Sequence, residues 1–360
     1  MIIAIDATNI GSGGGINHLK NYLINSLKFY SENRYIIFIS NSSKIDKINN
    51  NNLTYKTLNF NTILFSFLFD QELLKLNCDL LFSPGGIFLG KFKPVVTMSQ
   101  NMLPFSKSEI KRFDLKKRIK FLLLNKLLVK SFNKSDGIIF LSDYAQKIIR
   151  QNILQKNQVI IPHGGGENSI MPQKTKNNKL KFLYVSDFWP YKNHEYIISL
   201  LLDYSKQRDI ELHLVGFYTK KIKNRLDLKF SKDLDYNKNI FFHGFVNHNE
   251  IDKFYLDCDV VIFPSSCENL PIAIIEALSY SKPILTLDIE PMKKMIFSNG
   301  HYLKINNYQY SLNTLIKFCK SENLNYVSVK NAQLSKKYKW KSNAIETNNF
   351  FKKILNENTI

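Results

Sequence analysis

The chain has 360 residues, of which 44% are hydrophobic, a combination that excludes a disordered or fibrous protein and predicts two or three globular domains. Its 50 Lys and Arg against 30 Asp and Glu give a net charge of +20, which attracts phosphates, nucleic acid or an anionic membrane without choosing among them. No apolar run approaches the roughly 20 residues that cross a bilayer, and residues 1–6 lack the basic lead of a secretion signal, so we expect a cytosolic protein.

Short apolar runs bounded by turn residues recur along the first half of the chain, and most are separated by stretches long enough for a helix. These expected strands are residues 2–6, 35–40, 80–83, 95–98, 137–142 and 159–162. Strands that are apolar throughout, rather than alternating, are typical of a parallel sheet covered on both faces. The first half is therefore predicted to form a doubly wound α/β domain over residues 1–170.

The same pattern starts again in the second half. The expected strands there are residues 181–186, 211–216, 240–244, 260–264 and 283–287, with helical spacers such as 194–207 and 250–256. A polar segment, 167–179, separates the two series and is predicted to be a linker. The expected fold class is thus α/β, with a second Rossmann-like domain over residues 178–340 and the strand carboxyl ends of both domains facing a cleft. Residues 341–360 are predicted to end the chain as a helix.

Residues 263–279 hold the most informative motif. An apolar strand ends at Pro264, a short polar loop follows, and Pro271 suits the start of a helix because its missing N–H would be unpaired there. The backbone N–H groups and the positive dipole end of such a helix favour a phosphate. Glu268 precedes this helix and Glu276 lies inside it among apolar residues, where sugar hydroxyls would be suitable hydrogen-bond donors. Taken alone, Glu276 is as readily a helix residue that reaches solvent.

The spacing of the two glutamates, eight residues apart after Pro-Ser, resembles the Glu-x7-Glu signature of the retaining glycosyltransferases of family four, which have the GT-B fold. The resemblance implies that Glu268 contacts the donor sugar and that Glu276 binds the ribose hydroxyls. It also implies that the backbone after Glu268 holds the diphosphate, through residues Asn269, Leu270, Pro271 and Ile272.

A second segment, 183–194, is similar to the part of that family in which an Arg and a Lys neutralise the donor diphosphate. Lys192 matches the Lys, whereas Asp187 stands where the family usually has the Arg. Residues 239–246 look like the segment that places the nucleobase, and this resemblance assigns Phe245 and Val246 to the base. Trp340 and the last helix, 341–360, resemble the family element that crosses back to the first domain. Lys192 as a solvent-exposed residue at a helix start is the simpler alternative.

In the first domain a glycine-rich loop at residues 11–15 follows a strand and precedes a helix, an arrangement that lets the backbone approach an anion. Its spacing does not match the dinucleotide fingerprint. The resemblance places Gly14 and Gly15 near the diphosphate and the acceptor. It also places Gln100 and Asn101 in a loop where a family His often faces the reacting sugar, so these two are candidate catalytic residues beside Glu268.

Neither acidic nor cysteine motifs predict a metal site. Asp257 and Asp259 form an Asp-x-Asp pair, which holds a divalent ion in another glycosyltransferase fold. Asp259 opens the strand 260–264 at its amino end, away from the expected ligand edge. The four cysteines lack zinc-site spacing. We therefore expect no metal and no cofactor, and a nucleotide diphosphate sugar linked to UDP or GDP as the donor substrate.

Residues 107–134 combine ten Lys or Arg with many apolar side chains and only two acids. A basic amphipathic helix of this kind can lie on an anionic membrane. It can equally be a domain helix with a core face and a solvated basic face. Both interpretations stay open on the sequence.

These observations lead to one hypothesis and two alternatives. The hypothesis is a retaining, metal-independent glycosyltransferase that moves a sugar to a hydroxyl of a bacterial surface-glycan acceptor, such as lipopolysaccharide or capsule, in the cytoplasm or at the inner face of the cell membrane. The first alternative is a nucleic-acid-binding protein that uses the basic surface, although no known reading module is present and we expect no nucleic-acid partner. The second is an inactive nucleotide-sugar-binding homologue, suggested by Asp187 and Gln100.

Overall fold

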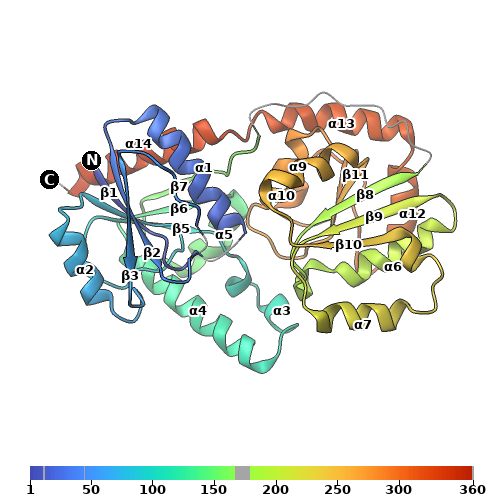
Figure 1. Ribbon diagram of the computed structural model, residues 1–360, viewed down its shortest axis with the longest axis horizontal. Coiled ribbons are helices and arrows are strands. Elements are labelled where there is room, and N and C mark those ends of the chain that lie inside the picture. The colour runs from blue at the N-terminus through green and yellow to red at the C-terminus, as the bar shows by residue number, and fades with distance from the viewer. Residues whose placement is uncertain (11–12, 44, 167–178, 359–360) are drawn as a thin grey trace. The chain divides into compact units, whose positions relative to one another are not determined.

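The computed structural model describes residues 1–10, 13–43, 45–166 and 179–358, and within helix α9 the side chains of residues 248 and 249 are also left out. The chain forms two compact units, each described here by itself (Figure 1). Unit 1 is Met1–Gly164 together with Lys339–Ile360, and unit 2 is Gly165–Tyr338. Most of the predicted linker and the first glycine of the predicted loop lie outside the described residues.

Unit 1 is built on a parallel sheet of seven strands in the order β3-β2-β1-β4-β5-β6-β7. The strands are β1 (Ile2–Asp6), β2 (Arg34–Ser40), β3 (Leu53–Leu58), β4 (Leu80–Ser83), β5 (Val95–Ser99), β6 (Gly137–Phe140) and β7 (Gln158–Ile160). Six of them were predicted to within two residues. β3 was missed because it lies at the sheet edge and its side chains are mostly exposed or half-buried, so its sequence has no apolar run.

Helices cover both faces of the unit 1 sheet. They are α1 (Gly14–Phe29), α2 (Ser66–Lys75), α3 (Lys107–Ile110), α4 (Leu115–Lys134), α5 (Asp143–Ile149) and α14 (Trp340–Asn358), with short 3-10 turns at Leu103–Phe105 and Arg150–Asn152. Figure 1 shows the last helix, α14, running beside α1. Its buried Phe351 packs against Phe82 of β4, with 5.2 Å between the ring centroids. The carboxyl-terminal helix is therefore part of the core of unit 1.

Unit 2 has a parallel sheet of five strands in the order β10-β9-β8-β11-β12. The strands are β8 (Leu180–Val185), β9 (Ile210–Val215), β10 (Ile240–Gly244), β11 (Val260–Phe263) and β12 (Ile284–Thr286), all predicted to within one residue at the amino end. The helices are α6 (His194–Ser205), α7 (Lys220–Phe230), α8 (Tyr236–Asn239), α9 (His248–Asp257), α10 (Ile272–Ser279), α11 (Met292–Met295), α12 (Tyr308–Phe318) and α13 (Ser321–Ser335), with a 3-10 turn at Pro190–Lys192.

The strand order of unit 2 creates a topological switch point between β8 and β11. The chain leaves β8 toward β9 on one side, whereas β11 and β12 lie on the other side of β8. In open parallel sheets such a point leaves a crevice beyond the strand carboxyl ends, where ligands bind. The loops after β8 and β11 are therefore the expected place for a ligand in this unit.

One face of this sheet departs from the expectation of strands covered on both sides. Along β9 the buried residues alternate with half-buried Glu211 and His213. On β10 the corresponding positions are half-buried Phe241 and exposed His243. This face is thus half-solvated along β9 and β10.

The predicted basic helix at 107–134 is in fact two helices, α3 and α4, separated at residues 111–114. The first two turns of α4 have no core face, since Leu115, Ile119, Leu122 and Leu123 are between 51% and 71% exposed. This arrangement is not that of a domain helix with one packed face over its whole length. Among the described residues no helix has both the length and the apolarity that crossing a membrane requires.

Candidate functional site

Two predicted residues from distant parts of the chain meet at the switch point of unit 2. The ammonium group of Lys192 forms an ion pair with Oε1 of Glu268, and the hydroxyl of Ser265 donates to the same oxygen at 2.5 Å. Both charged side chains are 13% exposed. A cation and a carboxylate are thus held together, largely shielded from water, at the carboxyl edge of the sheet.

The loops that carry this pair are held by hydrogen bonds to their backbone carbonyl groups. The side-chain amide of Asn193 donates to the carbonyl of Pro264 at 2.7 Å, and the N–H of Ser266 donates to the carbonyl of Tyr191 at 2.8 Å. The buried hydroxyl of Tyr184 donates to the carbonyl of Lys192 at 2.7 Å. Because each loop fixes the other, the Lys192–Glu268 pair is preorganised rather than dependent on a ligand.

Glu276, the second glutamate of the motif, lies in α10 and is half-buried. Its Oε2 accepts a hydrogen bond from the hydroxyl of Tyr255 at 3.0 Å. Burial, reinforced by the nearby Glu276 charge, raises the pKa of Tyr255 well above its usual value, so that the phenol stays a proton donor. The orientation of Glu276 is therefore set by a residue of α9, a contact that the sequence did not reveal.

The backbone predicted to hold a diphosphate forms the start of α10. Pro271 occupies the capping position, Ile272 is the first helical residue, and Asn269 and Leu270 before them are 4% and 7% exposed. The first turn of α10 carries no acidic side chain. The positive end of this helix is thus not opposed by a carboxylate of its own first turn.

Asp187, at the position of the family Arg, has a structural role. Its Oδ1 accepts a hydrogen bond at 2.8 Å from the N–H of Phe217 and so joins the loops that follow β8 and β9. Phe245 and Val246 follow the carboxyl end of β10, with Phe245 73% exposed and Val246 half-buried. These residues share the carboxyl edge of the unit 2 sheet with Lys192 and Glu268.

In unit 1 the structure brings Gly15 and Gln100 together. Gly14 and Gly15 open α1, and a Cβ at Gly15 would lie 3.4 Å from the side-chain oxygen of Gln100. Gln100 is therefore beside the glycine loop. The side chain of Asn101 instead accepts a hydrogen bond from the N–H of Leu103 at 2.9 Å and orders the turn that follows.

Both members of the acidic pair, Asp257 and Asp259, contact Lys181. Oδ2 of Asp257 lies 2.8 Å from the ammonium of Lys181, and Oδ2 of Asp259 accepts from the Lys181 backbone N–H at 2.7 Å. Asp259 precedes β11 at its amino end, as expected. Among the described parts of the chain, no group of three or more His, Cys, Asp or Glu is arranged to hold a metal ion.

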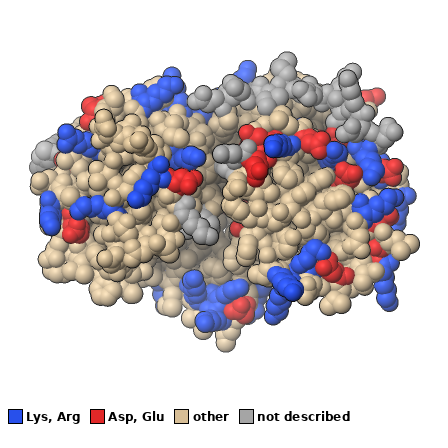
Figure 2. All heavy atoms as spheres, viewed as in Figure 1, with Lys and Arg blue, Asp and Glu red and all other residues tan. Residues whose placement is uncertain are grey.

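The basic residues are not gathered in one band on the face drawn in Figure 2. Lys and Arg side chains lie in separate groups there, several beside Asp or Glu. One such group lies where Figure 1 places α3 and the start of α4. A continuous basic stripe, which typifies nucleic-acid-binding surfaces, is not seen on this face.

Comparison with known proteins finds a family model that is similar to the second half of the chain. Residues 167–335 match the model described as Glycosyl transferases group 1. The chain is 25% identical over 279 residues to the capsular polysaccharide biosynthesis glycosyltransferase CapH of Staphylococcus aureus, a match that spans 74% of each protein. It is also 25% identical over 158 residues to an Escherichia coli UDP-Gal:alpha-D-GlcNAc-diphosphoundecaprenol alpha-1,3-galactosyltransferase, across 42% of this chain and 40% of that enzyme.

Among solved structures, sucrose-phosphate synthase from Thermosynechococcus elongatus is similar over 99% of this chain and 100% of its own. The TM-score is 0.78 at 12% sequence identity. This likeness concerns the fold alone, and it confirms the predicted α/β, GT-B fold class.

Proposed function

Because residues 167–335 match the model described as Glycosyl transferases group 1, we propose that the chain transfers a sugar from a nucleotide diphosphate sugar to a hydroxyl of a bacterial surface-glycan acceptor. The observation that carries this proposal is the Lys192–Glu268 pair at the switch point of unit 2. The similarity to CapH, a glycosyltransferase of capsular polysaccharide biosynthesis, supports the acceptor class.

The chemistry of glycosyl transfer explains why these groups belong together. The leaving diphosphate gains negative charge as the sugar becomes cationic, so catalysis needs a fixed cation and N–H dipoles on one side and a carboxylate on the other. Lys192 and the start of α10 serve the diphosphate, and Glu268 serves the sugar. Glu276, oriented by Tyr255, accepts hydrogen bonds from ribose hydroxyls.

The proposal extends to stereochemistry and metal use. The anomeric configuration is retained, and protein charges alone neutralise the diphosphate. The ion pair supports metal independence, because contacts within unit 2 hold the Lys192 cation in place for the diphosphate. Product analysis by NMR tests retention, and turnover in excess chelator tests independence from metal.

Nucleotide release from a panel of UDP- and GDP-linked sugars tests the activity. With the donor that wild type uses, Glu276→Ala is expected to weaken donor binding at least tenfold, because the ribose loses a charged acceptor worth about 1.5–3 kcal/mol. Glu346→Ala, on the exposed face of α14, is the matched control and is expected to behave as wild type. Equal donor affinity in both variants would contradict the role of Glu276, and no turnover with any donor would contradict the activity.

The exposed start of α4 is proposed to bring the enzyme to anionic lipid. Leu115, Ile119 and Leu122 recur at helical spacing on one side of α4, and Lys116 and Lys120 lie among them. An exposed apolar stripe with basic neighbours fits the boundary between headgroups and acyl chains, where each basic residue adds about 1 kcal/mol. An acceptor carried on a membrane lipid would then be reached from the surface.

Vesicle flotation tests this surface. The triple variant of Leu115, Ile119 and Leu122 to Ser is expected to bind vesicles containing phosphatidylglycerol at least tenfold more weakly than wild type, and wild-type binding is expected to fall with salt. The matched control replaces three exposed leucines elsewhere, Leu154, Leu228 and Leu234, with Ser. Equal losses in both triple variants, or equal binding to neutral phosphatidylcholine vesicles, would exclude a specific lipid surface on α4.

A further inference from the structure

A pocket of about 350 Å³ lies on the half-solvated face of the unit 2 sheet. Its lining comes from β8, β9, β10 and α9 and consists of Lys181, Leu183, His213, His243, Lys253, Phe254, Asp257 and Cys258. None of the residues assigned to the donor sugar or its nucleotide lines it. The pocket is therefore separate from the proposed donor site of this unit.

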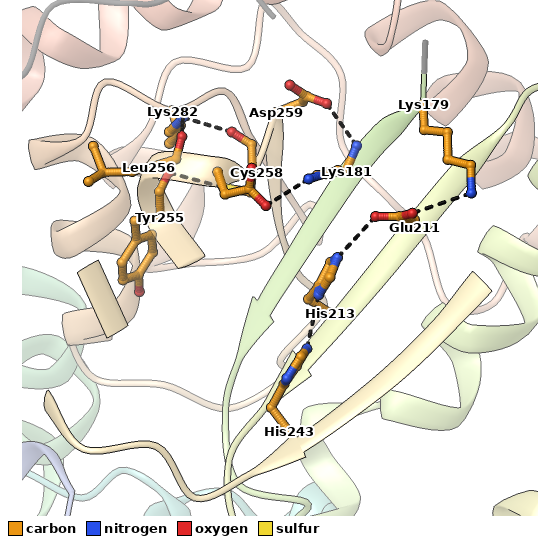
Figure 3. Close-up of polar contacts among 11 residues, drawn as sticks. Lys179, Lys181, Glu211, His213, His243, Tyr255, Leu256, Cys258, Asp259 and Lys282 are labelled. Atoms are coloured by element: carbon orange, nitrogen blue, oxygen red, sulfur yellow. Dashed lines mark hydrogen bonds and ion pairs between the residues drawn. The ribbon is translucent and has the colours of Figure 1, made fainter. Parts of the chain in front are cut away.

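Two histidines from neighbouring strands face each other in this pocket (Figure 3). Nδ1 of His213 on β9 lies 2.9 Å from Nε2 of His243 on β10. On the other side of the same ring, Nε2 of His213 lies 3.4 Å from Oε2 of Glu211, whose Oε1 is 3.3 Å from the ammonium of Lys179. Glu211 is thus held as a charged acceptor behind His213.

The tautomer of His213 follows from this arrangement. A carboxylate accepts a hydrogen bond, so Nε2 of His213 carries the proton and Nδ1 presents its lone pair to His243. A carboxylate behind an imidazole, with the lone pair on the far nitrogen, is the arrangement that orients histidine ligands of metals. His243 then donates the hydrogen on its Nε2 to Nδ1 of His213. A metal ion bound by both nitrogens would replace this hydrogen.

The separation of the two nitrogens suits a shared ion. At metal–nitrogen distances of about 2.0–2.1 Å, two imidazole nitrogens in adjacent coordination positions lie roughly 2.9–3.4 Å apart. The observed 2.9 Å lies within this range, and both lone pairs converge on one ion when the two rings turn from the end-on contact that they make here.

We propose that His213 and His243 form a binding site for a divalent transition metal of the Cu²⁺, Zn²⁺ and Ni²⁺ class, with water completing the coordination. Imidazole nitrogens select these ions over Mg²⁺ and Ca²⁺, and Cu²⁺ binds most tightly in this series. Asp257 does not supply a third ligand as it stands, since Lys181 already engages it at 2.8 Å. The bound ion joins β9 to β10, and its binding stabilises unit 2.

Copper titration of the full-length protein without a histidine tag tests this site. One Cu²⁺ per chain is expected, with an electron paramagnetic resonance spectrum that shows two imidazole nitrogens. His213→Asn and His243→Asn are each expected to lower the affinity at least tenfold, and Glu211→Gln to lower it about tenfold. His301→Asn, whose ring contacts the carbonyl of Ser298 elsewhere in the unit, is the matched control.

Two readouts keep the proposal falsifiable. Circular dichroism checks that each variant is folded, and Zn²⁺ is expected to raise the unfolding temperature of wild type and His301→Asn but not of the two site variants. The proposal is overturned if either site variant keeps wild-type copper affinity, or if the spectrum shows fewer than two imidazole nitrogens.

Discussion

At the scale of single residues, the most informative contact is the one between Tyr255 and Glu276. The fully buried phenol donates to the carboxylate at 3.0 Å and to the carbonyl of Ala273 at 3.1 Å. It thereby ties the second glutamate of the motif to α9. We regard Tyr255 as a positioning residue, since the carboxylate and not the phenol is proposed to meet the ribose.

Replacing Tyr255 with Phe is expected to raise the KM for the donor several-fold and to leave kcat closer to wild type. The lost hydrogen bonds cost about 1–2 kcal/mol of stability as well. Tyr236→Phe is the matched control, because its hydroxyl donates to Asp227 at 2.9 Å elsewhere in unit 2. Steady-state kinetics and urea unfolding separate the effects, and a KM change no larger than that of the control would argue against a positioning role.

His194 makes unit 2 sensitive to acid. Its buried ring stacks on Phe188 and Tyr184, and burial, with the charge of Lys192, lowers its pKa to about 3. The unfolded chain binds this proton near pH 6.5 and the folded chain only near pH 3, so the free energy of unfolding falls as the pH is lowered through this range.

Between pH 7.5 and 5.0 this one residue is expected to remove about 2 kcal/mol of stability. His194→Phe keeps a stacking ring and cannot be protonated, so its unfolding free energy should depend less on pH by that amount. Urea unfolding at the two pH values, followed by tryptophan fluorescence, measures the difference. The same pH dependence in variant and wild type would rule out His194 as the source.

How far the site follows from sequence is clear from its individual residues. Lys192 and Glu268 were chosen because their motifs resemble those of a glycosyltransferase family, and they meet because both follow strands whose carboxyl ends converge in a parallel sheet. Ser265 was not identified as a partner of Glu268, nor Tyr255 as a partner of Glu276, because those contacts depend on loop conformation and helix packing. The untested roles of Gln100 and Asn101 stay predictions.

At the scale of elements, apolar runs located nearly every strand, and the failures have a common cause. The edge strand β3 and the outer face of β9 carry polar side chains because neighbouring elements do not cover them. The first turns of α4 are the opposite case, because their side chains are apolar and yet exposed. The sequence pattern shows which side chains are polar. Whether a face of an element is buried depends on the other elements that pack on it.

The attachment of α14 to unit 1 rests on a buried polar network around Asn348. Its side-chain amide donates to Ser26 at 3.0 Å, and its oxygen accepts from Asn33 at 3.1 Å and from Tyr35 at 3.3 Å. Asn348 is completely buried. Removing it leaves several polar groups without a partner in the core.

Asn348→Leu is therefore expected to lower the free energy of unfolding by about 3 kcal/mol or more. Asn349→Leu is the matched control from the next position, where the side chain is exposed and contacts Tyr30 at 3.0 Å. That change is expected to cost less than about 1 kcal/mol. Urea unfolding compares the two, and similar losses would mean that the network adds little to the attachment of α14.

At the scale of the whole molecule, the backbone passes between the units at two positions that lie side by side. The N–H of Gly165 donates to the carbonyl of Tyr338 at 3.1 Å. At Gly164 the chain comes so close to Trp340 that an added Cβ would lie 2.2 Å from the Trp340 nitrogen. Glycine is therefore needed where the first passage meets the second.

Gly164→Ala is expected to lower the unfolding temperature by several degrees, because backbone atoms must move to admit the methyl group. Gly166→Ala is the matched control, since an added Cβ there meets nothing closer than 3.4 Å. Differential scanning calorimetry measures both. An equal change in the two variants would show that the approach to Trp340 relaxes at little cost.

Both ends of the polypeptide lie in unit 1, so unit 2 is a single uninterrupted insert, whereas unit 1 is assembled from two separate stretches. An insert entering and leaving at adjacent residues can be exchanged through two cuts without breaking either sheet. If the proposed function holds, recombination at those seams would exchange the unit that carries Lys192 and Glu268 and leave the seven-stranded unit unchanged.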